Sequence, residues 1–253
     1  MIACAMLLSV TLYALGLRRL AQANRRFPVR ATLSFALGLA AIAAALSPPF
    51  DALADASLTW HMVQHLVLIN VAAPLLLLGA PVRLALAATP ARYATSLAKF
   101  LSSGFVGTLT HPIFAWLQFA TVLYVTHFSP LYELALENET VHSFEHLLFL
   151  VSALIFWTPL LAVAPAPHAP SHPVRILFIL LALPMSAFLG FAFYVTGHVL
   201  YAHYASHANA LADQMNAGTV MWLAGGTPLF LALLWNVADW GERERRLASI
   251  ADG

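Results

Sequence analysis

Seven apolar stretches, separated by short polar segments, run through the whole chain. They lie at approximately residues 1–17, 31–46, 58–78, 110–126, 140–161, 176–195 and 214–235. A helix needs about 20 mainly apolar residues to cross the hydrocarbon core of a bilayer. The pattern therefore predicts an all-α integral membrane protein with seven transmembrane helices. These spans leave no length for a soluble domain, so we expect residues 1–253 to form a single transmembrane domain.

The composition agrees with this pattern and excludes a soluble protein. Hydrophobic residues make up 61% of the chain and charged residues only 9%, with a mean hydropathy of +0.79. Soluble domains carry roughly 25% charged residues. The single cysteine, Cys4, excludes an internal disulfide and a CxxC metal site. We expect membrane lipid around the chain and no nucleic acid among its partners.

The basic residues fall only in alternate connecting segments. Five Lys or Arg lie in 18–30, three in 83–99, one at position 175 and three in 243–246, which together are all twelve. Because cytoplasmic loops are enriched in Lys and Arg, this distribution predicts an N-terminus outside and a C-terminus in the cytoplasm. No basic residue precedes the first stretch, so we expect a retained helix and not a signal peptide. The predicted location is the bacterial inner membrane, with several passes.

Two further features predict contacts with the membrane surface. The segment from Pro90 to Leu101 carries Arg92 and Lys99 and is expected to form a short helix at the membrane surface. Tryptophan and tyrosine side chains near the span ends are typical of interfacial anchors. These are Trp60, Tyr132, Tyr201, Trp235 and Trp240.

Two of the predicted spans begin with a His-x-x-x-His pattern. His61 and His65 head the third span, and His142 and His146 head the fifth, with Glu145 beside them. Residues four apart lie on one face of a helix, and both spans start at the outer face in the predicted topology. At 1.5 Å per residue, His65 lies roughly 10 Å inside the start of its span, where polar side chains normally face the bundle interior. The two pairs therefore predict a metal site between these helices.

Further metal-binding side chains are expected near the same face. The complete candidate set is His61, His65, His142, His146, Asp213, His127, Met62 and Met215. Imidazole binds copper, zinc and iron, and thioether sulfur adds a preference for Cu(I). We therefore expect copper, as Cu(I), with zinc as the alternative. Glu145 and Asp213 are candidates to hold the outer nitrogens of the imidazoles, whereas Met185 and Met221 are expected only to fill packing gaps.

Several motifs spread over the chain point to one family. They are His61-Met62-Val63-Gln64-His65, Ala73-Pro74-Leu75-Leu76-Leu77-Leu78-Gly79-Ala80-Pro81, His111-Pro112, Thr126-His127-Phe128-Ser129-Pro130-Leu131-Tyr132, His142-Ser143-Phe144-Glu145-His146, Trp157-Thr158-Pro159, and Asp213-Gln214 with Gly218 and Trp222. In these motifs the sequence resembles the CtaG family of cytochrome c oxidase assembly factors, of the type found in Bacillus. The resemblance implies a seven-span, non-enzymatic metallochaperone that helps to mature a haem–copper oxidase by handling copper outside the inner membrane. It also implies oxidase subunits as partners, with periplasmic copper chaperones as further candidates.

Three other interpretations of the histidines stay open. A seven-span zinc-dependent hydrolase would use a zinc-bound water as its nucleophile, with His65, His146 and Asp213 in the ligand roles. A b-type haem protein would ligate the haem iron through histidines on facing helices. In the third interpretation the histidines only make hydrogen bonds between helices. A visible spectrum identifies haem by its Soret band, and metal analysis separates copper from zinc.

Overall fold

The computed structural model describes residues 2–163 and 169–251, which contain helices and no strand. The long helices are α1 (Ile2–Gln22), α2 (Val29–Ala45), α9 (Pro112–Phe128), α11 (Glu139–Leu161), α12 (His172–Val195) and α14 (Ala210–Ala251). Another long element consists of α4 (Leu58–Val67), the π-helix η1 (Leu68–Ala72) and α5 (Ala73–Leu78). Short helices connect them: α3 (Pro48–Ala56), α6 (Pro81–Ala88), α7 (Ala91–Leu101), α8 (Gly104–Leu109), α10 (Pro130–Glu137) and α13 (Ala202–Ala205). The all-α prediction is confirmed for this part of the chain.

Each predicted span coincides with a helical element, and most of these elements can cross a membrane. Among the described residues, five helices are long and apolar enough, and a sixth span results if α2 and α3, which are bent by 52° at their junction, are taken as one. The remaining predicted span coincides with α9, a shorter apolar helix of 17 residues. Length and apolarity thus support a multi-pass membrane protein with five or six spans, while the number seven remains a prediction.

The connecting segments contain more helix than the sequence indicated. The segments 47–57 and 128–139 were expected to be loops, but they form α3 and α10. Each begins with a proline after a serine, and proline suits the first position of a helix because its φ angle is already helical. Pro48 and Pro130 therefore each follow the end of one helix and begin the next. The expected surface helix is present as α7, of which no residue is buried.

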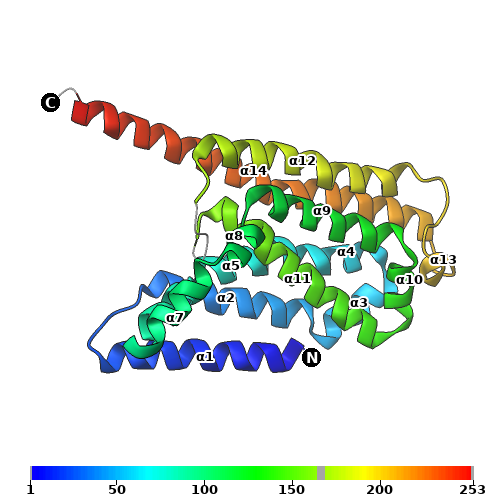
Figure 1. Cartoon of the computed structure of the whole chain (residues 1–253). Coiled ribbons are helices and arrows are strands. Elements are labelled where there is room, and N and C mark those ends of the chain that lie inside the picture. Colours follow the sequence, from blue (N-terminus) through cyan, green and yellow to red (C-terminus); the bar gives the residue numbers. More distant parts are fainter. Residues whose placement is uncertain (1, 164–168, 252–253) are drawn as a thin grey trace.

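The helices form an elongated bundle with two different ends (Figure 1). The short helices α3, α10 and α13 lie together at one end, and α6, α7 and α8 lie at the other. Helix α14 pairs with α12 and then continues past the bundle at the α7 end, so residues 236–251 extend the last helix. The four segments that hold all twelve Lys and Arg also lie at the α7 end. This separation of charge is what the positive-inside rule requires, although the orientation in the membrane remains a prediction.

A local irregularity follows directly after the first histidine pair. Pro74 has no N–H group, and its ring excludes the carbonyl of Asn70 from a normal helical hydrogen bond. The preceding residues form the π-helix η1, and Trp157 of α11 donates its indole N–H to the carbonyl of Ile69 at 2.9 Å. The contact satisfies a backbone oxygen inside the bundle and fixes α4 and η1 against α11. Such π-helical turns are frequent at functional sites.

Glycines allow α12 and α14 to approach one another closely. A Cβ atom added at Gly190 would collide with the backbone oxygen of Gly218, and one added at Gly218 would collide with the oxygen of Gly190. Small residues at such crossings let the backbones of membrane helices touch. The contact holds together the two helices that form one side of the bundle.

We expect Gly190→Ala to lower the free energy of unfolding by about 1–3 kcal/mol, the usual effect of overpacking a tight interior. The matched control is Gly107→Ala in α8, where an added Cβ meets nothing within 4 Å. Unfolding followed by circular dichroism in detergent measures both variants. Equal stability of the two variants would show that α12 and α14 are not in contact at these glycines.

Candidate metal centre

Two capped helix starts position the predicted histidine pairs. Helix α4 begins after Ser57, whose side chain accepts a hydrogen bond from the N–H of Trp60. Helix α11 begins after Asn138, whose side-chain oxygen accepts from the N–H groups of Thr140 and Val141 at 3.0 and 3.2 Å. Side-chain caps of this kind satisfy the free N–H groups of the first turn. They fix where each helix starts, and therefore the face on which its histidines lie.

The structure brings the four histidines that head α4 and α11 together. We call His61, His65, His142 and His146 the four-histidine cluster. Each contributes one ring nitrogen, and these nitrogens all lie within 4.8 Å of one another. The Nε2 atoms of His61 and His65 are 3.1 Å apart. Four nitrogens bound to one tetrahedral ion, at about 2.0–2.1 Å from it, are themselves about 3.3 Å apart, so small side-chain rotations would complete the geometry.

The hydrogen bonds of Tyr204 on α13 determine which ring nitrogen of His61 carries the proton. Its hydroxyl donates to the backbone oxygen of Ala54 at 2.9 Å and lies 3.1 Å from Nδ1 of His61. Burial, together with the nearby carboxylates, raises the pKa of Tyr204, so the phenol keeps its proton. Since that proton is directed at Ala54, the phenol oxygen accepts from Nδ1–H of His61. The Nε2 atom of His61 then offers a lone pair to the cluster, as expected of a metal ligand held by an outer hydrogen bond.

His127 of α9 presents a second oriented imidazole next to the cluster. Its Nδ1 atom donates to the backbone oxygen of Leu123 at 2.7 Å, which leaves a lone pair on Nε2. The ring centroids of His127 and His65 are 6.1 Å apart. His127 was among the predicted ligands, and the structure places it beside His65 and outside the four-histidine cluster.

Several buried polar atoms around the cluster have no hydrogen-bond partner among the described residues. They are Nδ1 of His65, Nε2 of His127, His142 and His146, both side-chain oxygens of Glu145, and the hydroxyl of Tyr132. A buried polar group without a partner costs about 1–3 kcal/mol, and native proteins contain few of them. Unpaired donor atoms concentrated at one point, most of them imidazole nitrogens, fit a bound cation. The residues present therefore suit a metal ion.

Glu145 is the acidic group nearest to the cluster. Its side chain is buried, and one oxygen lies 3.9 Å from Nε2 of His65. The distance is too long for a hydrogen bond. The carboxyl group therefore lies beside the imidazoles without fixing either of their nitrogens, and it can balance the charge of a cation bound there.

Asp213 and the two predicted methionines lie apart from the cluster. The Asp213 carboxylate accepts from the backbone N–H of Leu58 at 2.6 Å and from the hydroxyl of Ser57 at 2.8 Å, so it caps the start of α4 from α14. It supports the histidines indirectly, since α4 carries the first pair. Met62 is fully buried and lines a cavity below His65, whereas Met215 is half-buried on α14.

Tyrosines cover the histidines, and sequence reasoning missed their role. Tyr132 and Tyr201 were expected to be interfacial anchors, but both are buried and stack on each other at a centroid distance of 4.2 Å. Tyr132 also stacks on His127 at 5.4 Å. Burial raises the pKa of both phenols, so they remain protonated. These tyrosines lie on different elements from the histidines of α4 and α11. No spacing in the sequence therefore indicated that the tyrosines and the histidines are in contact.

We expect Tyr204→Phe to weaken metal binding by about 10–100-fold, the usual effect of removing an outer partner of a ligating histidine. The phenyl ring keeps the packing and removes the acceptor for Nδ1–H of His61. The matched control is Tyr201→Phe, because the Tyr201 hydroxyl donates to the backbone oxygen of His127 at 2.9 Å and orients no imidazole. Competition titration with a chromophoric chelator measures the affinities. Unchanged affinity in the Tyr204 variant would contradict the tautomer assigned to His61.

The fold and the site define a helical, multi-pass membrane protein with four histidines, three of them buried and one half-buried, converging near one end of its bundle. Residues 11–243 match the family described as cytochrome c oxidase caa3 assembly factor (Caa3_CtaG). The match covers most of the chain, so the protein belongs to this family, and the family resemblance seen in the sequence motifs is confirmed.

Curated relatives come from mycobacteria. An uncharacterised protein of Mycobacterium tuberculosis and one of Mycobacterium bovis are each 27% identical to this chain over 253 residues, which cover 95% of the chain and 38% of each relative. An uncharacterised protein of Mycobacterium leprae is 26% identical over 252 residues, with coverages of 93% and 38%. The chain thus spans about two-fifths of the length of the curated relatives it matches. No solved structure matches the chain.

Proposed function

We propose that the protein binds copper, as Cu(I), in the four-histidine cluster and delivers it to a haem–copper cytochrome c oxidase during assembly. The observation that carries this proposal is the convergence of four imidazoles, with nitrogens within 4.8 Å of one another, in a chain of the oxidase assembly family. Copper is the cargo in this proposal. The protein contributes a site that binds the ion and later releases it.

Charge and ligand type favour Cu(I) over divalent ions. Neutral imidazoles carry no charge, and the carboxyl group of Glu145 lies 3.9 Å from Nε2 of His65. A monovalent cation with one carboxylate gives a neutral site, whereas a divalent cation leaves an excess positive charge in a medium of low dielectric constant. Imidazole also suits zinc, so zinc remains the alternative metal.

The space around the histidines argues against the haem and hydrolase alternatives. The cavity next to His65 and His127 has a volume of about 40 Å³. Sites for organic ligands usually measure about 300–1,000 Å³, so the size of this cavity favours a single ion over a porphyrin or an organic substrate. A single metal ion does fit. A non-enzymatic role agrees with membership of an assembly factor family.

The distribution of charge supports delivery at the outer face of the bacterial inner membrane. All twelve Lys and Arg lie in segments at the α7 end, and the histidines lie near the opposite end, which α3, α10 and α13 cover. Cytoplasmic segments are the ones enriched in Lys and Arg, so the histidine end faces outward. Oxidase subunits are then the receiving partners, and periplasmic copper chaperones are candidates to supply the ion.

The test is the copper content of the oxidase in cells that lack this protein. We expect a lower ratio of copper to haem in the purified oxidase, with its subunits still synthesised, and partial recovery when copper is added to the medium. Reintroducing the wild-type gene is the control. An oxidase with a full complement of copper in the deletion strain, with no second copy of the gene present, would contradict the proposal.

A further inference from the structure

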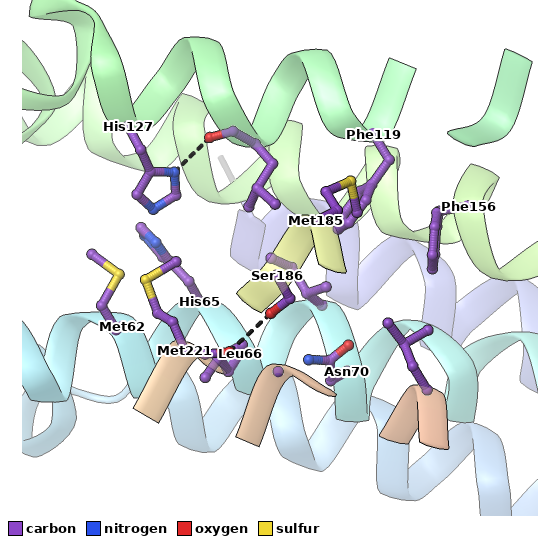
Figure 2. A pocket seen from close by; sticks show the side chains of 14 residues that line it. Met62, His65, Leu66, Asn70, Phe119, His127, Phe156, Met185, Ser186 and Met221 are labelled. Atoms are coloured by element: carbon purple, nitrogen blue, oxygen red, sulfur yellow. Dashed lines mark hydrogen bonds between the residues drawn. The ribbon is translucent and has the colours of Figure 1, made fainter. Parts of the chain in front are cut away.

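A buried cavity lined by methionine sulfur lies directly below the four-histidine cluster. We call it the methionine cavity; its polarisable and polar lining residues are Met62, Met185, Met221, His65, His127 and Asn70. The rest of its wall is mainly aliphatic and aromatic. Figure 2 shows Met62, Met221 and His127 around His65, with Met185 further along the cavity beside Phe119.

The three thioethers come from three different helices. Met62 lies on α4, Met185 on α12 and Met221 on α14, and each is at most 5% exposed. All three line the methionine cavity, with Met62 and Met221 beside His65 and Met185 further along the cavity (Figure 2). Thioether sulfur is a soft ligand that selects Cu(I). Sequence reasoning assigned Met185 and Met221 to packing alone because no spacing pattern joins them to Met62.

Two imidazoles complete the set of ligands in the cavity. The Nε2 atom of His127 is buried and has no partner among the described residues, while its Nδ1 atom is held by the oxygen of Leu123 at 2.7 Å. His65 lines the cavity and also belongs to the four-histidine cluster, with Nδ1 unpartnered. His65 therefore joins the cluster to the methionine cavity.

The helices around the cavity are held at fixed positions. The Ser186 hydroxyl of α12 donates to the backbone oxygen of Met221 at 2.9 Å, as Figure 2 shows. A Cβ atom added at Gly225 would collide with that hydroxyl, so α12 and α14 are in close contact beside the cavity. The volume of about 40 Å³ exceeds the 10–15 Å³ or so that one water molecule needs and suits a single ion.

We propose that the methionine cavity is a second Cu(I) site, formed by the sulfur atoms of Met62 and Met221 with His65 and Nε2 of His127. The proposal rests on copper binding in the four-histidine cluster. An ion moves between the two sites by ligand exchange: bonds from copper to the nitrogens of His61, His142 and His146 break, and bonds to Nε2 of His127 and to the sulfur atoms of Met62 and Met221 form. The shared His65 keeps the ion coordinated throughout, and copper remains Cu(I) because no electron is transferred.

The test counts Cu(I) ions bound to the purified chain in detergent, without oxygen and in competition with a chromophoric Cu(I) chelator. We expect two Cu(I) per wild-type chain and one in the double variant Met62→Leu, Met221→Leu. Leucine and methionine have similar volumes, so the fold should tolerate the change, and thermal unfolding checks this. The matched control is Met215→Leu, a half-buried methionine of α14 outside the cavity, which should still bind two.

A second variant separates failure of this inference from failure of the proposed function. His61→Ala with His142→Ala disrupts the four-histidine cluster and keeps His65, so one Cu(I) should remain, with sulfur ligands visible in X-ray absorption spectra. If the wild type and the double leucine variant both bind one ion through nitrogen alone, the second site does not exist and the proposed function stands. If the wild type binds no Cu(I), both proposals are wrong.

Discussion

Replacing both His65 and His146 by alanine will remove Cu(I) from the four-histidine cluster. Each variant deletes one nitrogen from the set that lies within 4.8 Å. Loss of an outer partner already weakens a metal site by about 10–100-fold, so loss of a ligand should cost at least about 100-fold in affinity for each single variant. The double variant keeps only one ligand on α4 and one on α11. It should therefore bind no measurable Cu(I) in the four-histidine cluster.

Two histidines outside the cluster serve as controls for this experiment. His198 is exposed in the segment before α13, so His198→Ala changes no contact inside the bundle. His172 lies at the α7 end, where its Nε2 atom is 2.8 Å from a carboxylate oxygen of Asp239 on α14. Both variants should bind Cu(I) like the wild type. If the His65→Ala and His146→Ala proteins also bind Cu(I) like the wild type, the copper site does not exist. The four histidines would then serve only in hydrogen bonding and packing.

The same double variant should fail to support oxidase assembly in cells. A strain that makes His65→Ala, His146→Ala protein in normal amounts should yield an oxidase with the same lowered ratio of copper to haem that we expect of the deletion strain. The physical reason is that release to the oxidase requires a loaded donor, and the variant has lost ligands from both helices of its site. A strain that makes His198→Ala protein should yield an oxidase with its full copper content. If the oxidase keeps its full copper content in cells that make the double variant, the assembly role does not depend on these histidines.

The main parts of the site could be predicted because they follow from helical geometry. An i, i+4 pair must share a face, and two pairs that begin their helices at the same side of a membrane reach similar depths. His61, His65, His142 and His146 therefore converge as the sequence indicated.

The contacts that depend on distant segments could not be predicted. The Asp213 carboxylate was expected to assist the metal site. It accepts a hydrogen bond from the backbone N–H of Leu58, 155 residues away, and so caps the start of α4. Tyr204 reaches His61 from α13 only because the chain folds the short helices over one end of the bundle. The segments 47–57 and 128–139 were expected to be loops, yet a proline starts a helix in each of them. Polar side chains that meet from separate elements have no regular spacing in the sequence, so these contacts could not be predicted from it.

The most direct test of copper binding is the metal content of the chain, purified from copper-replete cells without chelator and without immobilised-metal chromatography. We predict at least about one copper per chain, coordinated by imidazole nitrogen in X-ray absorption spectra, and loss of that nitrogen-bound copper in the His65→Ala, His146→Ala variant. A protein that carries zinc instead, or that binds no metal even after Cu(I) is added, would contradict the account.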